Sequence, residues 1–348
     1  MKAVVYHEFN GPISLETVPD PEPAPNGAVI QVEATGLCRS DWHGWHGRDS
    51  DIRQLPHVPG HEFAGKVVEV GRDVSRSFIG QRVTIPFVAG CGACPECESG
   101  NQQICDHQYQ PGFTGWGSFA EYVAIRYAAG NLIPLPENIS SIAAAALGCR
   151  LATAYRAVAS QGAVEPGQWV AIHGCGGVGL SAIMVAHALG ARVIAVDVRD
   201  EPLLLAKSLG AEVALNAAAA DDIPAAIHEF TRRGADVSLD ALGSAVTFAN
   251  SIRSLRKRGR HVQVGLLAPN EDLPATIVNR ITSHELTLAG SHGLAAHAYP
   301  ALLALIAAGK LDPERLVDRT TTLDEAPAAL ASMDDFRGSG ITIFTPNA

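Results

Sequence analysis

The sequence predicts a two-domain α/β protein, in which a doubly wound parallel sheet domain follows a smaller β-rich domain. The chain has 348 residues, the length of two domains of about 100–200 residues each. Up to about residue 150, short β-rich runs are broken by Pro and Gly. From about residue 167, strand-like and helix-like segments alternate, the pattern of a parallel sheet covered on both faces.

The first half of the chain is expected to form short strands between proline and glycine breaks. A proline-rich connector occupies 19–25 and separates early strands. The expected strands lie at 28–34, 63–70 and 82–85.

In the second half, apolar strand-like runs alternate with longer helical ones. The expected strands lie at 169–173, 192–196, 237–239 and 261–265, and the expected helices at 180–189, 202–209 and about 246–257. Gly190 and Gly210 end the first two helices, as glycine commonly does. A basic run over 253–260 is expected at a solvated helix end.

The tail from about residue 298 is expected to hold one helix and the apolar run 341–344, and to fold back onto the first domain. We therefore predict a first domain of residues 1–150 and 298–348 and a second domain of residues 151–297.

Composition excludes several classes of partner. Lys and Arg number 26 against 36 Asp and Glu, a net charge of −10, which disfavours binding to a phosphate backbone. We find no apolar run of membrane-spanning length and no apolar stretch typical of a signal peptide at the N-terminus. We therefore expect no nucleic-acid or membrane partner and a cytoplasmic location.

A glycine-rich loop follows the expected strand 169–173 and opens the next helix. Gly174, Gly176 and Gly179 form G-x-G-x-x-G, with Gly177 and Val178 inside the motif. In this context the motif is the dinucleotide-binding fingerprint, in which glycines allow close approach of a pyrophosphate to a helix N-terminus.

Asp197 ends the next expected strand, roughly 20 residues past the loop, where a carboxylate binds the adenosine ribose hydroxyls. It would repel a 2′-phosphate, so NAD is favoured over NADP, although Arg199 is close enough to weaken that preference. The alternative is an ordinary strand–turn–helix with Asp197 as a helix cap.

Four of the seven cysteines crowd into one loop. Cys91, Cys94, Cys97 and Cys105 have the spacing C-x2-C-x2-C-x7-C, which is typical of a closed, tetrahedral structural zinc site. An iron–sulfur cluster shares the first part of that spacing. A nucleic-acid zinc ribbon is a third interpretation, which the acidic charge disfavours.

Further residues of the types that bind metals lie far from one another in the sequence: Cys38, the pair His61-Glu62, and Cys149. Their spacing alone does not predict that they meet in the folded protein. Spacing alone favours a buried thiol or a core histidine at each position.

Taken together, however, the motifs resemble those of the zinc-dependent medium-chain alcohol dehydrogenases. The family's order is matched over nearly the full length by Cys38-Arg39-Ser40-Asp41, Gly60-His61-Glu62, the four-cysteine loop, Cys149 and the glycine loop. The resemblance implies a Rossmann-type NAD-binding domain and a GroES-like β-rich catalytic domain. It also implies two zinc ions per chain, one catalytic and one structural.

The resemblance assigns roles to single residues. Cys38, His61 and Cys149 would bind the catalytic zinc, with Glu62 beside it, and Asp41 would fix the His61 ring. Ser40 would hydrogen-bond the substrate oxygen, and His43 would pass the proton through the cofactor ribose to solvent. Arg39 would contact the pyrophosphate, and Val264 and Ser291 would make further cofactor contacts. Trp45 and Phe87 would narrow the substrate pocket.

The expected activity is reversible oxidation of a small or medium neutral alcohol, primary or secondary, to an aldehyde or ketone with NAD. A polyol or other secondary-alcohol dehydrogenase of the same superfamily is one alternative, and a non-catalytic NAD- and zinc-binding redox sensor is another. The resemblance further implies a homo-oligomer, with a tetramer favoured over a dimer.

Two positions depart from the family's common pattern, and a third, Cys175, has two interpretations. Arg150 follows Cys149, where a small residue is usual, and would alter the charge of the pocket if it points inward. The arginine common near Gly340 is absent, and Arg337 is a candidate substitute. Cys175 in the glycine loop is interpreted as a packing residue, with an oxidation-sensitive thiol as the alternative.

Overall fold

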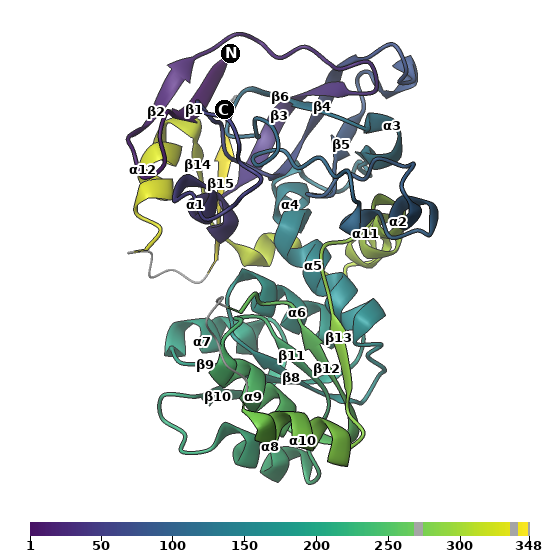
Figure 1. The fold of residues 1–348 in the computed structure, drawn as a ribbon, viewed down its shortest axis with the longest axis vertical. Helices are drawn as coiled ribbons and strands as arrows, with labels where there is room; N and C mark the ends of the chain where they lie inside the picture. The colour runs from purple at the N-terminus through teal and green to yellow at the C-terminus, as the bar shows by residue number, and fades with distance from the viewer. Residues whose placement is uncertain (268–273, 335–339, 347–348) are drawn as a thin grey trace. The chain divides into compact units, whose positions relative to one another are not determined.

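The computed structural model describes residues 1–267, 274–334 and 340–346 (Figure 1). The chain divides into two compact units. Unit 1 comprises Met1–Ala152 and Gly293–Ala348, and unit 2 comprises Thr153–His292. The mixed α/β architecture confirms the predicted fold class, with a parallel sheet in the second unit and a β-rich first unit.

Unit 1 is built around a sheet whose strands run in the order β14-β15-β3-β4-β5-β7, with β6 paired to β3. The strands are β3 (Ala28–Gly36), β4 (Glu62–Val70), β5 (Arg82–Thr84), β6 (Tyr122–Ile125), β7 (Ile133–Pro134), β14 (Val317–Thr322) and β15 (Ile341–Thr345). A separate hairpin pairs β1 (Lys2–Tyr6) with β2 (Ile13–Thr17). The apolar run near the C-terminus forms β15, which lies between β14 and β3 in this sheet.

Alternating apolar residues of β3 and β4 form the core of this sheet. Ala28, Ile30 and Val32 are buried on one face of β3 and pack in a cluster with Phe63 and Val67 of β4. Burying each large apolar side chain stabilises the fold by about 1.5–3 kcal/mol. Short helices surround the sheet: α1 (Arg39–Trp45), α2 (Pro95–Glu98), α3 (Ala128–Asn131), α4 (Ser141–Ala146), α11 (Tyr299–Ala307) and α12 (Ala326–Ala331).

Unit 2 is a six-stranded sheet in the order β10-β9-β8-β11-β12-β13, with every neighbouring pair parallel. Its strands are β8 (Trp169–His173), β9 (Arg192–Asp197), β10 (Ala211–Asn216), β11 (Ala235–Asp240), β12 (Leu255–Gln263) and β13 (Thr287–Gly290). Its helices are α6 (Gly177–Ala188), α7 (Asp200–Ser208), α8 (Ile223–Thr231), α9 (Ala245–Arg253) and α10 (Ala275–Ser283), and α5 (Ala152–Tyr155) lies at the boundary between the units. This strand order is that of Rossmann dinucleotide-binding domains, whose ligand binds at the carboxyl ends of the strands.

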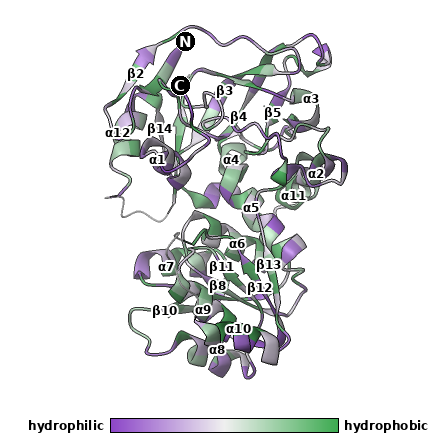
Figure 2. Ribbon diagram, viewed as in Figure 1, coloured by the Kyte–Doolittle hydropathy of each residue, from purple (hydrophilic) through white to green (hydrophobic). Residues whose placement is uncertain are grey.

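The sequence explains why unit 2 takes this form. β8 and β9 read as nearly continuous apolar runs, as expected for strands covered on both faces, and α6 is apolar and buried over Gly179–Ala186 (Figure 2). Gly190 follows α6 in the left-handed region, at a φ of +82°, which ends the helix as predicted.

Two sequence predictions of secondary structure are wrong. The helix expected to reach residue 257 ends at Arg253, because β12 begins at Leu255, which pairs with Ala235 of β11, and the basic residues 256–258 lie at a shift in that register. Pairing on both edges of β12 overrides the helix propensity of Arg and Lys. Where the structure describes it, the tail holds two α-helices, α11 and α12, although one was expected. A proline near the start of the short α12 favours its initiation.

One helical stretch within the described ranges, Ser141–Gln161, is long and apolar enough to cross a membrane. It is 72% buried in the protein, as expected for a core helix.

Candidate active site

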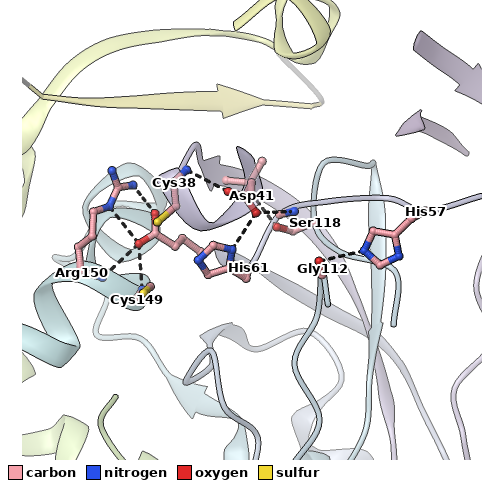
Figure 3. A network of polar contacts seen from close by, with 11 residues as sticks. Cys38, Asp41, His57, His61, Gly112, Ser118, Cys149 and Arg150 are labelled. Atoms are coloured by element: carbon pink, nitrogen blue, oxygen red, sulfur yellow. Dashed lines mark hydrogen bonds and ion pairs between the residues drawn. The ribbon is translucent and has the colours of Figure 1, made fainter. Parts of the chain in front are cut away.

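Asp41 organises the first part of the site. It lies in the first turn of α1, where its Oδ2 accepts a hydrogen bond from the backbone N–H of Cys38 at 2.9 Å. Its Oδ1 accepts from the N–H of Gly60 at 3.0 Å and lies 2.8 Å from Nδ1 of His61 (Figure 3). Because a carboxylate can only accept, the Nδ1–H of His61 donates, and in the neutral ring this makes Nε2 the acceptor that a metal could bind.

A break in the helix that follows α4 presents Cys149. Gly148 has φ −6° and ψ −127°, far from helical values, and a Cβ at this position would lie 2.5 Å from Cβ and Cγ of Glu62. Only glycine therefore lets this segment pass so close to β4. The turn brings the Cys149 thiol to the Cys38 and His61 side chains.

Glu62, at the start of β4, is fully buried and paired with Arg150. Its Oε1 accepts from the backbone N–H of Cys149 at 2.9 Å and from Nε of Arg150 at 3.1 Å. The Arg150 side chain is only 10% exposed and also donates Nη2 to the other carboxylate oxygen. Burial raises the pKa of Glu62, and the Arg150 charge opposes that effect.

These residues form a donor set that fits zinc. The donor atoms of Cys38, His61, Glu62 and Cys149 all lie within 4.8 Å of one another. Nε2 of His61 is buried and has no hydrogen-bond partner among the described residues, as expected of a nitrogen reserved for a metal. A hydrogen bond from Cys149 holds the pKa of the Cys38 thiol well below its ordinary value despite burial. Thiolate and neutral imidazole are the ligands that zinc prefers.

The four-cysteine loop forms a second, separate donor set. Sγ atoms of Cys91 and Cys97 lie 4.0 Å apart, and those of Cys94 and Cys105 lie 3.7 Å apart. Four thiolates around one zinc at about 2.3 Å would stand about 3.8 Å from each other. Backbone N–H groups donate to two of the sulfurs, which suits thiolates, and hydrogen bonding lowers the pKa of Cys94 to about 6. The spacing fits a single ion better than an iron–sulfur cluster.

The glycines of the loop in unit 2 differ in their surroundings: Gly179 is packed against the backbone, whereas Gly176 faces open space. A Cβ on Gly179 would lie 1.8 Å from the backbone oxygen of Gly174, so this glycine serves the packing of helix on strand. A Cβ on Gly176 would meet nothing within 4 Å. With Gly177 and Val178 in the first turn of α6, this open side leaves room for a phosphate at the helix N-terminus.

Asp197 ends β9 beside this loop. Its carboxylate accepts from the N–H of Cys175 at 2.7 Å and from the N–H of Arg199 at 3.0 Å. Large apolar side chains are exposed just beyond the carboxyl ends of three strands of the sheet, which suits contact with an aromatic base; these are Val198, Leu242 and Leu266. Cys175 itself is buried, and burial raises its pKa, so the structure supports the packing interpretation over the reactive thiol.

Two residues expected to move a proton lie on one face of α1. Ser40 and His43 are three positions apart and half-buried. Burial, with the charges of Arg39 and Arg48, lowers the pKa of His43, so its ring is neutral near pH 7 and able to accept a proton. Arg39 stacks on Trp42 and pairs with Asp334 at 2.7 Å, both in unit 1.

The remaining expected residues differ in how close they lie to the site. The Phe87 ring centroid is 6.4 Å from that of His61, whereas Trp45 donates its indole N–H to Gly11 and packs on the core near β1. In unit 2, the N–H of Val264 donates to Asp240, and the buried hydroxyl of Ser291 has no hydrogen-bond partner among the described residues. Arg337 lies outside the described residues.

Sequence reasoning missed two aromatic residues. The ring of Phe113 lies 5.0 Å from that of His61, closer than Phe87. Tyr299, at the start of α11, is buried, and its hydroxyl has no partner in the described part of the chain. Both stand in segments without a motif, so only the fold could place them.

A Rossmann-type unit joined to a unit with two metal-donor sets defines a zinc-binding dehydrogenase, and the comparisons agree. A family model for the alcohol dehydrogenase GroES-like domain matches residues 24–137, and one for zinc-binding dehydrogenases matches residues 177–308. The chain belongs to the zinc-dependent medium-chain alcohol dehydrogenase family, and the protein is an oxidoreductase.

Similar proteins cover nearly the whole chain. The NAD-dependent alcohol dehydrogenase of Sulfurisphaera tokodaii is 33% identical over 356 residues, 99% of this chain and 100% of that protein. An alcohol dehydrogenase of Geobacillus stearothermophilus is 36% identical over 81% of each chain. The structure of the alcohol dehydrogenase from Thermus sp. ATN1 is 35% identical over the full length of both chains, with a TM-score of 0.89.

Proposed function

We propose that the protein is an NAD-dependent, zinc-dependent alcohol dehydrogenase that interconverts small or medium neutral alcohols with their aldehydes or ketones. The observation that carries this proposal is the convergence of Cys38, His61 and Cys149, with Nε2 of His61 buried and unpartnered among the described residues. Three protein ligands of this kind hold a catalytic zinc with one open position.

When bound here, zinc supplies a Lewis acid that lowers the pKa of an alcohol oxygen, and NAD supplies the hydride acceptor. Asp41 holds the His61 ring in the tautomer that leaves Nε2 free. Ser40 accepts the alcohol proton, and His43, neutral near pH 7, receives it in turn and releases it to solvent.

The side chains around the candidate zinc site in unit 1 favour a neutral substrate. Phe87 and Phe113 present aromatic rings to His61, and the charge of Arg150 is already neutralised by Glu62. A substrate acid or phosphate would therefore find no counter-ion from Arg150. We also assign Trp45, whose indole N–H donates to the carbonyl of Gly11, to the pocket wall.

Unit 2 supplies most of the proposed cofactor site. We assign pyrophosphate binding to the open side of the loop at 174–179 and to Arg39 of unit 1, ribose binding to Asp197, and further contacts to Val264 and Ser291. The position of Asp197 favours NAD over NADP. We also propose a cytoplasmic homo-oligomer, a tetramer rather than a dimer, which light scattering of the purified protein would measure.

The test is consumption of NADH with a panel of simple aldehydes, ketones and oxidised polyols, with NADPH in parallel. We expect NADH-dependent turnover on simple carbonyls that a zinc chelator abolishes and that His61→Ala lowers by several orders of magnitude. Unchanged turnover in that variant would sink the catalytic assignment. Preference for the polyol products would favour the polyol dehydrogenase alternative, and comparable NADPH rates would remove the role of Asp197 in cofactor choice.

A further inference from the structure

Arg150 directly follows Cys149, a candidate metal ligand, and its guanidinium group lies inside the site against Glu62. It is buried, and both its Nε and its Nη2 donate to Glu62. Its backbone N–H also donates to Glu62, at 3.2 Å, beside the bond from Cys149. Both oxygens of Glu62 therefore accept hydrogen bonds from the segment that carries the third zinc ligand.

Yet Glu62 also stands within reach of the metal. Its donor oxygen lies within 4.8 Å of those of Cys38, His61 and Cys149. A carboxylate is itself a good zinc ligand at about 2.0–2.2 Å. Without a competing partner, a small rotation of the side chain would make Glu62 a fourth protein ligand and fill the position that an alcohol needs.

The surrounding backbone fixes the pair in one arrangement. A Cβ at Gly148 would lie 2.5 Å from Cγ of Glu62, and one at Gly36 would lie 3.0 Å from its Oε2 and 3.3 Å from Nη2 of Arg150. Glycines on both sides thus admit the ion pair where larger residues would collide with it. Removing the arginine would leave a buried carboxylate without its main cation, which is unfavourable unless it finds another.

We propose that Arg150 is a positioning residue that holds Glu62 away from the catalytic zinc and so keeps the fourth coordination position open. The inference rests on the proposed function, because it assumes that Cys38, His61 and Cys149 bind the metal. It assigns a purpose to a residue that the sequence marks only as a departure from the family pattern.

The experiment uses cobalt(II) in place of zinc in the full-length protein. The visible ligand-field bands of cobalt shift when one ligand is exchanged for another, so they report a carboxylate in the fourth position without any turnover. Arg150→Met keeps much of the buried volume and removes the charge and donors. Glu62→Gln keeps an acceptor for the backbone N–H groups but is a poor ligand. The four-cysteine site adds the same background to every variant, so difference spectra isolate the Cys38 site.

We expect Arg150→Met to shift the cobalt bands, to retain catalytic zinc against a chelator at least as well as the parent, and to lose about 10–100-fold in turnover. The double variant with Glu62→Gln should regain the parent spectrum, because the competing ligand is gone. Arg256→Ala, which breaks a partly buried arginine–carboxylate pair with Asp236 in unit 2, is the matched control and should leave the spectrum unchanged.

An unaltered cobalt spectrum in Arg150→Met, or the same altered spectrum in the double variant, would overturn the proposal. Failure of Arg150→Met to take up cobalt while the double variant binds it would also overturn the proposal, because a freed Glu62 should add a ligand and not remove the metal. Loss of binding in both variants would overturn it in favour of a purely structural arginine. Since these readouts need no substrate, they remain decisive even if the parent oxidises none of the alcohols in the panel.

Discussion

A single carboxylate shows how much of the site depends on individual atoms. Asp41 receives three hydrogen bonds, from the N–H groups of Cys38 and Gly60 and from the ring of His61. It therefore positions two zinc ligands at once and selects the His61 tautomer. The motif around Cys38 and His61 led us to predict Asp41, but its bond to Gly60 depends on how α1 meets the start of β4.

Other single residues could not be predicted. Phe113 carries no motif, and the direction of Arg150 depends on the non-helical turn at Gly148, which exists because Glu62 packs against it. The contact between Glu62 and Arg150 joins positions 88 residues apart, and no local pattern encodes either contact.

At the residue scale, His173 predicts a pH dependence of stability. Burial at the end of β8, with the nearby His261, lowers the pKa of His173 to about 3, so the folded protein keeps it neutral. The unfolded chain takes up the proton below its ordinary pKa of about 6.5. Its contribution to the free energy of unfolding is therefore complete above about pH 6.5 and falls by about 1.4 kcal/mol for each pH unit below it, towards pH 3.

Urea unfolding between pH 7.5 and 4.5 would measure this effect. In His173→Asn, unfolding should take up about one proton fewer, so the free energy of unfolding should fall less steeply with decreasing pH, by about 1.4 kcal/mol per pH unit. Equal slopes for the parent and the variant would show that His173 does not titrate in this way.

Secondary-structure elements could be predicted where local signals agreed. The strand at 169–173 is confirmed residue for residue, since its apolar run and the glycine turn that follows it specify the same element. The end of β12 was predicted as the strand 261–265, but its first part was predicted as helix because its basic residues favour a helix locally. The strand begins earlier because Leu255 pairs with Ala235 of β11. Tertiary pairing decided the outcome there.

The turn between β8 and α6 yields a paired prediction. Gly179→Ala places a methyl group 1.8 Å from a backbone oxygen, so we expect it to lower the melting temperature and abolish NADH binding. Gly176→Ala meets no protein atom within 4 Å and has an ordinary backbone conformation. It should leave the melting temperature within about 2 °C and weaken NADH binding by about 10-fold or more, because its methyl group occupies the phosphate approach.

Scanning calorimetry and titration of NADH fluorescence would separate the two variants. The idea that Gly176 faces the cofactor would be wrong if Gly176→Ala bound NADH as tightly as the parent.

At the scale of the whole molecule, the two units hold different ligand sites. Both metal-donor sets lie in unit 1, whereas the glycine loop and Asp197 lie in unit 2. The division into a β-rich unit and a parallel-sheet unit was predictable, because the sequence pattern changes near residue 150. The exact return point of the chain into unit 1 was not, since it lies in an irregular stretch before α11.

This separation predicts that the units respond to different additives in calorimetry. A zinc chelator should lower the transition of unit 1, because a structural zinc contributes directly to folding free energy. NADH at 100 times its Kd should stabilise unit 2 by about 2.7 kcal/mol. Equal shifts of one common transition by either additive would contradict this independence.

The position of β15 bears on how the protein is made. The strand at 341–345 lies between β14 and β3, so the sheet of unit 1 is complete only when the last part of the chain has left the ribosome. About 190 residues are synthesised between Ala152 and that strand, which takes roughly 10–40 s at typical rates. The contiguous unit 2 can fold during this interval. Until then the N-terminal part of unit 1 lacks β14 and β15, so apolar surface of its unfinished sheet stays exposed and prone to aggregation.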